Sequence, residues 1–177
     1  KIVFPETITA GQFGKLRNTS ELDYVCFCRD PYTEGNILSA FSIEGELLWQ
    51  TPGWKYYRPP RLADINHDGK DEVIVAVDDE LRIIDGGSGE IIQKTYLPAG
   101  GPMLDNYTPE FGTKVHLYHF YPCQLRPEPA NMDILIMDGN AGGGWNIWVY
   151  DDKLQQRFAM TFEQPRFGHH AYFCDIN

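Results

Sequence analysis

The sequence predicts an all-β chain built from repeated four-stranded units. Short runs rich in Val, Ile, Tyr, Phe and Trp are bounded by Gly, Pro, Asn and Asp, which is typical of strands between turns. No run of useful length has the 3.6-residue apolar period of an amphipathic helix. The runs also recur in a fixed order, with Gly11, Asp64, Phe120 and Asp175 as equivalent positions at intervals of roughly 55 residues.

Each unit contains an opening strand, a loop, an acid followed by an aliphatic strand, a third strand that ends in a turn, and a closing strand. Asp23 precedes the second strand in the first unit, Asp71 or Glu72 in the second and Asp133 in the third. The turns EGELLWQ and GSGEIIQ align at their Gly-Glu pair. The predicted strands after the openings are DYVCF, LSAFSI and ELLWQ; EVIVAV, LRIID and EIIQKTYL; and DILIMD, NIWVYD and QRFAMTF.

A four-stranded repeat of this length is typical of a β-propeller blade. The expected blades are residues 1–57, 58–112 and 113–165, and residues 166–177 supply the first strand of a fourth. Three blades and one strand do not close a ring, which takes about four blades. We therefore expect a single segment of a larger propeller, completed by its remaining blades.

Composition excludes several classes of partner. The net charge of −10 is unfavourable for binding nucleic acid or an anionic membrane surface, because phosphate binding needs an excess of Lys and Arg. No apolar run approaches the roughly 18 residues that a membrane-spanning helix needs. Cys26, Cys28, Cys123 and Cys174 leave buried thiols, bridges and a soft-metal site all open, with buried thiols favoured.

The loop DINHDGKDE between two predicted strands has the composition of a calcium loop. Alternate positions carry hard oxygen donors, Gly69 permits a turn, and a strand follows directly. The alternative is an exposed turn that is polar without binding a metal. The predicted ligands, for a structural rather than a catalytic Ca²⁺, are Asp64, Asn66, Asp68, the carbonyl of Lys70, and Glu72.

Two resemblances follow from these residues. The stretch LADINHDGKDEVIV resembles the FG-GAP-type calcium repeat of β-propeller proteins, which only this unit carries complete. DILI, the strand ending WVYD, and GHHAYFCDIN follow one another as in the propeller of bacterial rhamnogalacturonan and ulvan lyases. The second resemblance implies a secreted or periplasmic enzyme that cleaves an acidic, uronate-containing polysaccharide by β-elimination.

Candidate catalytic residues lie on two of the predicted opening strands. The ends of such strands are expected to meet at the face of a propeller where ligands bind. Proton transfer and carboxylate neutralisation in such a lyase are tasks for His, Tyr and Arg. His169 or His170 with Tyr172 is the predicted proton-transfer pair, and Arg166 with His119 is predicted to neutralise the substrate carboxylate. The alternatives are interior packing by these side chains, or a zinc site of His119, Cys123, His170 and Cys174.

The segment WKYYRPPR, between the first two units, carries candidate sugar-binding residues. Aromatic rings stack on sugars and guanidinium groups pair with carboxylates, which assigns this role to Trp54, Tyr57, Arg58 and Arg61. Packing between blades is the alternative, and it is favoured for Trp54. A non-catalytic FG-GAP propeller that binds carbohydrate or a protein remains the second hypothesis for the whole chain. Blades of the quinone-dehydrogenase type also share the GELLW turn, although a calcium loop is atypical of them.

Overall fold

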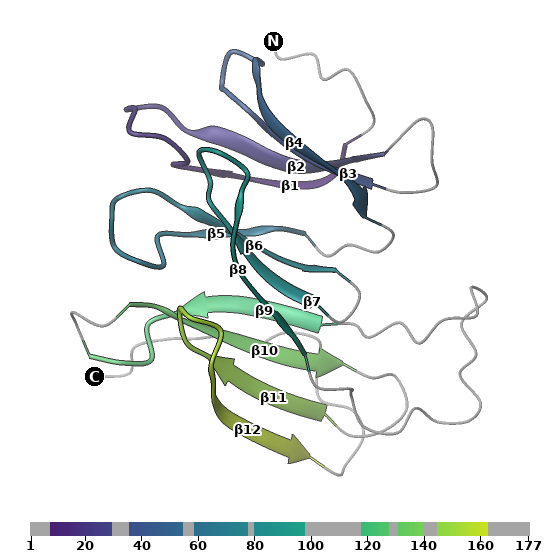
Figure 1. Cartoon of the computed structure of the whole chain (residues 1–177), viewed down its shortest axis with the longest axis vertical. Coiled ribbons are helices and arrows are strands. Elements are labelled where there is room, and N and C mark those ends of the chain that lie inside the picture. Colours follow the sequence, from purple (N-terminus) through teal and green to yellow (C-terminus); the bar gives the residue numbers. More distant parts are fainter. Residues whose placement is uncertain are drawn as a thin grey trace. The chain divides into compact units, whose positions relative to one another are not determined.

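The computed structural model describes residues 8–29, 36–54, 59–77, 80–97, 118–127, 131–139 and 145–162. The described part is all-β, as predicted, and consists of three four-stranded antiparallel sheets without a helix (Figure 1). The chain divides into two compact units, Lys1–Leu97 with the first two sheets and Pro98–Asn177 with the third. The predicted blade boundaries and the closure of a propeller ring remain predictions.

Within each sheet the strands follow one another in chain order, and every neighbouring pair is antiparallel. The opening strand of each sheet is therefore an edge strand. The first sheet contains β1 (Ile8–Gly14), β2 (Asp23–Arg29), β3 (Asn36–Phe41) and β4 (Leu47–Trp54). The second contains β5 (Arg61–Ala63), β6 (Glu72–Val77), β7 (Glu80–Ile84) and β8 (Ile91–Tyr96), and the third β9 (Tyr118–Cys123), β10 (Asp133–Gly139), β11 (Trp145–Tyr150) and β12 (Gln156–Phe162).

The strand register corrects the predicted alignment of the three units. Gly11 and Phe120 lie within β1 and β9, whereas Asp64 lies in the loop after β5. The last residue of each opening strand instead pairs with the first residue of the next strand. These pairs are Gly14 with Asp23, Ala63 with Glu72, and Cys123 with Asp133. Glu72, and not Asp71, is therefore the acid equivalent to Asp23 and Asp133.

The turns between the third and fourth strands share one backbone feature in all three sheets, although the turn of the second sheet is one residue longer. A residue with positive φ lies near the end of each turn, and it is Gly45 (φ 90°), Gly89 (φ 76°) or Leu154 (φ 55°). Its N–H donates to the carbonyl of Ser42, Asp85 or Asp151, respectively. Glycine adopts this left-handed conformation without the steric cost that a side chain brings. The Gly-Glu pairs in the sequence are explained by this turn.

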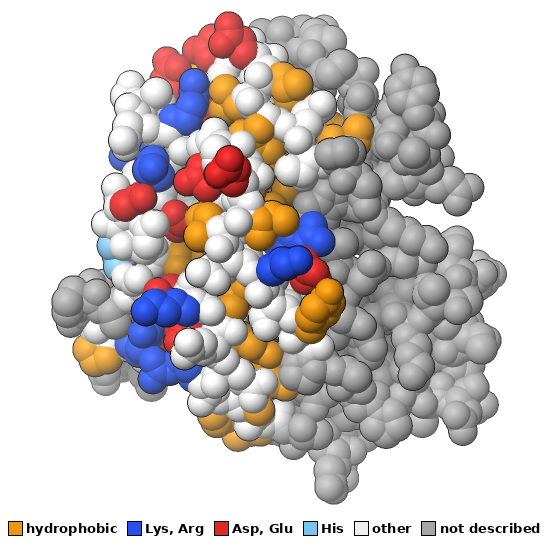
Figure 2. Space-filling view, viewed as in Figure 1, with side chains coloured by type: hydrophobic (Ala, Val, Ile, Leu, Met, Phe, Trp, Pro, Cys, Tyr) orange, Lys and Arg blue, Asp and Glu red, His pale blue; other side chains and the backbone are white. Residues whose placement is uncertain are grey.

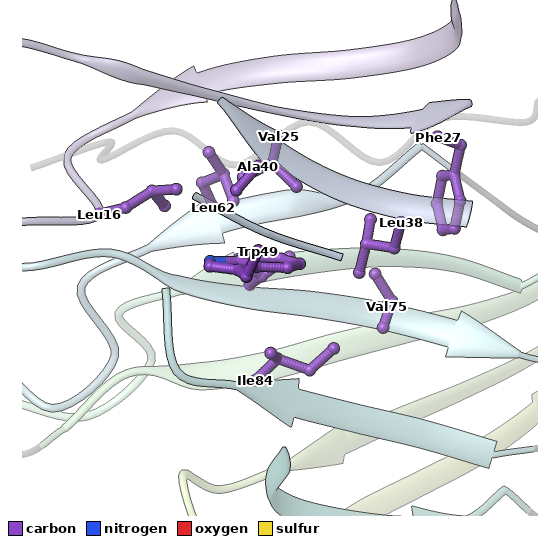
Figure 3. Packing of buried hydrophobic residues seen from close by; sticks show 10 residues of the cluster. Leu16, Val25, Phe27, Leu38, Ala40, Trp49, Leu62, Val75 and Ile84 are labelled. Atoms are coloured by element: carbon purple, nitrogen blue, oxygen red, sulfur yellow. The ribbon is translucent and has the colours of Figure 1, made fainter. Parts of the chain in front are cut away.

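The core of the first unit lies between its two sheets (Figure 3). Alternation along β2 directs Val25 and Phe27 into this core, while Cys26 and Cys28 belong to a separate small cluster on the other face. Trp49 is buried in the same core, and its Nε1 donates to the carbonyl oxygen of Gly86 at 2.7 Å. The cluster comprises Leu16, Val25, Phe27, Leu38, Ala40, Trp49, Leu62, Val73, Val75 and Ile84.

Polar contacts also join the first two sheets. The N–H of Lys15 donates to a carboxylate oxygen of Asp71 at 2.6 Å, and the N–H of Asp71 donates to the carbonyl of Lys15 at 2.7 Å. The side chain of Gln12 accepts a bond from the N–H of Leu62 at 3.2 Å. These bonds fix the loop after β1 against the start of β6. The side chain of Asp71 thus joins the two sheets.

Candidate functional site

The loop between β5 and β6, residues 64–71, is folded around the carboxylate of Asp64. One oxygen of that carboxylate accepts the N–H of Asp68 at 2.9 Å, and the other accepts the N–H of Gly69 at 2.8 Å. Gly69 has a φ of 87°, which confirms the turn predicted at this position. His67 also has a positive φ of 59°. The loop therefore turns back on itself, which brings its alternate side chains close together.

Glu72 closes this loop from the first position of β6. Its side chain is buried, and its two oxygens accept the N–H of Ile65 at 2.9 Å and the side-chain amide of Asn66 at 3.0 Å. Burial raises the pKa of Glu72 above its usual value, and the negative charges of Asp68 and Asp64 raise it further. The carboxylates of Asp64 and Asp68 are thus close enough to disfavour the charged form of Glu72.

The donor chemistry of this loop fits a hard divalent cation. Asp64, Asn66, Asp68 and Glu72 come together through their hydrogen bonds, and a carboxylate oxygen that accepts one bond keeps a lone pair for a cation. Lys70 instead donates its N–H to Asp68 and holds its ammonium 3.7 Å from that carboxylate. No group of three or more His, Cys, Asp or Glu side chains in the described ranges forms a ready-made metal cage. This predicted metal loop, residues 64–72, therefore has the ligand types of a calcium site but not a closed coordination shell.

The equivalent loop of the first sheet has an arginine, Arg17, at the position of Asn66. Arg17 donates to both oxygens of Asp23, from Nε at 3.0 Å and from Nη2 at 2.7 Å. The Asp23 side chain is completely buried, whereas that of Arg17 is 34% exposed. This side-on, two-point pairing is the strongest geometry available between a guanidinium and a carboxylate. It also raises the pKa of Arg17, mainly through the hydrogen bond to Asp23.

The equivalent loop of the third sheet also pairs an arginine with the buried acid, but through Nε alone, and Oδ1 of Asp133 accepts no hydrogen bond within the described residues. Nε of Arg126 lies 3.2 Å and 3.1 Å from the two oxygens of Asp133, whose side chain is buried. Nη2 of Arg126 donates to the carbonyl of Asn131 at 2.7 Å and to Asp152 at 3.4 Å. Asn131 donates to the other oxygen of Asp152 at 3.0 Å. Sequence reasoning missed both arginines, although each is the third residue after its opening strand.

Acidic and basic side chains lie next to one another at several places on the described surface (Figure 2). Three ion pairs have buried acids and so do not contribute their carboxylates to this surface: Arg17–Asp23, Arg82–Glu80 and Arg126–Asp133. No helix in the described part of the chain is long and apolar enough to span a membrane.

The structure tests little of the predicted catalytic and sugar-binding set. His119 is half-buried on β9, where it pairs with Met137 of β10. Arg61 is the first residue of β5, opposite Ile74, and Trp54 is the last residue of β4, although its side chain is not described. The remaining predicted residues, Tyr57, Arg58, Arg166, His169, His170 and Tyr172, lie outside the described residues.

The described cysteines are buried thiols. Cys26 and Cys28 lie on one face of β2 with their sulfurs 3.7 Å apart, too far for a disulfide bond. Cys123 is buried at the end of β9. Two members of the alternative zinc set, His170 and Cys174, fall outside the described residues. The preference for thiols over bridges therefore agrees with the described part of the structure.

We expect Cys123 to resist alkylation in the folded protein. Burial raises the pKa of its thiol to about 11, so little thiolate forms at neutral pH. At pH 8, iodoacetamide should modify Cys123 at least about 100-fold more slowly in the folded chain than in urea, as read by mass spectrometry of its peptide. Equal rates in the two states would contradict this burial.

The fold of this chain, three successive four-stranded antiparallel sheets, is similar to that of known all-β proteins. Two solved structures carry that likeness. One is rhamnogalacturonan lyase YesW, with a TM-score of 0.67 and 14% identity over 88% of this chain and 34% of that chain. The other is the Bacillus licheniformis rhamnogalacturonan lyase PL11, with a TM-score of 0.64 and 12% identity over the same shares.

The chain spans about a third of the length of these two structures, and identity this low establishes a common fold rather than a common activity. No protein-family model matches the sequence. No curated protein matches it either.

Proposed function

We propose that this chain is a segment of a lyase-type β-propeller that cleaves an acidic, uronate-containing polysaccharide by β-elimination. The observation that supports the proposal is the similarity over 88% of the chain to two proteins described as rhamnogalacturonan lyases. Three successive four-stranded sheets, each opening with an edge strand, agree with blades of such a propeller. The remaining blades would come from outside this sequence, and the enzyme would act in the periplasm or outside the cell.

The proposed reaction divides among the residues predicted from the sequence. His169 or His170 removes the proton at C5 of the uronide, and Tyr172 takes part in protonating the departing O4. Arg166 and His119 neutralise the carboxylate, which makes the C5 proton more acidic. Trp54, Tyr57, Arg58 and Arg61 bind neighbouring sugars. The reaction breaks the C4–O4 bond and leaves a double bond between C4 and C5.

The proposed calcium ion is structural. Asp64, Asn66, Asp68 and Glu72 would hold it, with the carbonyl of Lys70 as a further ligand. The ion would offset the mutual repulsion of the three carboxylates and stabilise the loop between β5 and β6. No step of the reaction is assigned to it.

A second candidate function is a non-catalytic propeller that binds carbohydrate or a protein. One observation agrees with this function. The described ion pairs Arg17–Asp23 and Arg126–Asp133 hold loops in place and do not present reactive groups. This hypothesis predicts binding of the polysaccharide without turnover.

The test uses the full-length protein and a panel of rhamnogalacturonan, ulvan and other uronide polymers. We expect a rise in the ultraviolet absorbance of the unsaturated uronide, and the double variant His169→Ala/His170→Ala should lose at least about 100-fold in kcat. Arg157→Ala, at an exposed position on β12, is the control and should retain activity. Polymer binding by the wild type without any absorbance rise would favour the non-catalytic propeller, and full activity of the double variant would refute the assignment of His169 and His170.

A further inference from the structure

The three sheets share one buried acid. Asp23, Glu72 and Asp133 are each the first residue of the second strand, and their relative exposures are 0%, 4% and 1%. A buried carboxylate is costly unless a positive charge and hydrogen bonds compensate it. Each sheet must therefore supply compensation at the same place in its fold.

The residue that faces this acid comes from the same position of the preceding loop. It is the third residue after the opening strand in all three sheets: Arg17 after Gly14, Asn66 after Ala63, and Arg126 after Cys123. Each of these three side chains donates a hydrogen bond to the buried acid of its own sheet. The position of the donor and its hydrogen bond to the acid are thus the same in the three sheets. The donor is a charged guanidinium in the first and third sheets and a neutral amide in the second.

The first and third sheets neutralise the acid internally. The guanidinium of Arg17 engages both oxygens of Asp23, and that of Arg126 lies between both oxygens of Asp133. Arg126 also donates to the carbonyl of Asn131 in the same loop and to Asp152 after β11, so it connects several oxygens at once. A bound cation would connect the same kinds of atom in the same way.

The second sheet lacks this internal charge. Asn66 offers Glu72 a neutral amide, and the described residues give Glu72 no ion pair with Lys or Arg. Lys70 lies close to Asp68, whose side chain is 42% exposed, rather than to the buried acid. Asp64 and Asp68, in the same loop as Asn66, add two further carboxylates close to Glu72. The contrast between sheets with equal geometry is an observation independent of the acidic composition of the loop.

We infer that Arg17 and Arg126 are built-in cations, which take in their sheets the place that a divalent cation takes beside Glu72. The third loop residue then decides the source of the charge: an arginine makes the loop independent of metal, and an asparagine leaves it open to an external ion. These three loops consequently bind one Ca²⁺ between them. The calcium part of this inference rests on the proposed metal loop, whereas the roles of the two arginines do not.

The test exchanges the two kinds of loop. Metal-stripped wild type is titrated with CaCl₂ by calorimetry, and thermal unfolding is followed with CaCl₂ and with a chelator. We expect one bound ion and a midpoint that is about 7 °C higher at saturating calcium. Asn66→Arg should bind no calcium, and its midpoint in chelator should rise toward that of the calcium-loaded wild type.

Two further variants keep the test decisive if Asn66→Arg does not fold. Arg17→Met and Arg126→Met each leave a buried carboxylate without its partner, so their midpoints should fall by roughly 10 °C, equally with and without calcium. Arg157→Met, at an exposed position on β12, is the matched control and should change the midpoint by less than about 2 °C.

The possible outcomes separate the two proposals. A wild type that binds no calcium refutes the metal loop and the calcium part of the inference, and it leaves the lyase assay unaffected. Calcium binding that survives Asn66→Arg unchanged overturns the inference while the metal loop stands. Unchanged midpoints for both Arg17→Met and Arg126→Met also overturn it, whatever the wild type binds.

Discussion

Replacement of Trp49 by alanine is expected to reduce the free energy of unfolding by about 3–5 kcal/mol. The ring lies in the core between the first two sheets and is 8% exposed. A Cβ built at Gly89 would come within 2.7 Å of this ring, so the ring is tightly enclosed. Alanine would lose the buried apolar surface and leave a cavity that the turn at Gly89 cannot easily fill.

Trp49→Phe separates the packing of the ring from its hydrogen bond. Phenylalanine keeps most of the apolar surface but leaves the carbonyl of Gly86 without the donor now 2.7 Å away, at a cost of about 1–3 kcal/mol. Urea unfolding followed by far-ultraviolet circular dichroism measures both variants, because that signal does not depend on the indole. Leu47→Ala, at a side chain that is 51% exposed, is the control and should change stability by less than about 0.5 kcal/mol. A loss below 1 kcal/mol in Trp49→Ala would exclude a central role for this ring.

Gly86→Ala is expected to destabilise the first unit by about 3 kcal/mol through overpacking. The added Cβ would lie 2.1 Å from the carbonyl oxygen of Asp71 and 3.0 Å from Cδ2 of Leu16. Leu16 is completely buried, and Asp71 is held by two hydrogen bonds with the backbone of Lys15. Relief of the clash would therefore require breaking an inter-sheet contact or displacing a core side chain.

The neighbouring glycine gives a matched control for this effect. A Cβ at Gly87 would have contacts of 3.4 Å and 3.5 Å, which are ordinary van der Waals distances. Gly87→Ala should change the free energy of unfolding by less than about 0.5 kcal/mol. Similar urea midpoints for the two alanine variants would show that the close approach of Gly86 to Asp71 does not restrict the fold.

Local chemistry explains how much of the fold the sequence could predict. The strands follow from β-branched and aromatic runs between turn residues, and the turns at Gly45 and Gly89 follow from a conformation that glycine adopts freely. The prediction failed in the register of the repeat. The sequence pattern aligns Gly11 and Phe120 with Asp64 as equivalent positions, which the structure shows to be wrong. Loop length and side-chain type vary between the units and mislead such an alignment, whereas backbone pairing is the same in all three.

The candidate site was also predicted only in part from the sequence. Adjacent positions in one loop indicated Asp64, Asn66, Asp68 and Glu72, and the structure brings these side chains together through hydrogen bonds. The ambiguity between Asp71 and Glu72 could not be resolved from the sequence, because two adjacent acids precede one strand. Their partners separate them: Asp71 bonds to Lys15 from another sheet, whereas Glu72 bonds within its own loop.

The sequence by itself determined the all-β class, the succession of four-stranded units and the composition of the acidic loop, since each depends on residues that are near one another along the chain. Only the tertiary structure decided that Trp49 reaches Gly86 and that Asp71 reaches Lys15, because these contacts join positions far apart in the chain. It also showed that Arg17 and Arg126 stand where the second loop has Asn66. That equivalence follows from strand pairing, which sets which residues face one another regardless of their chemistry.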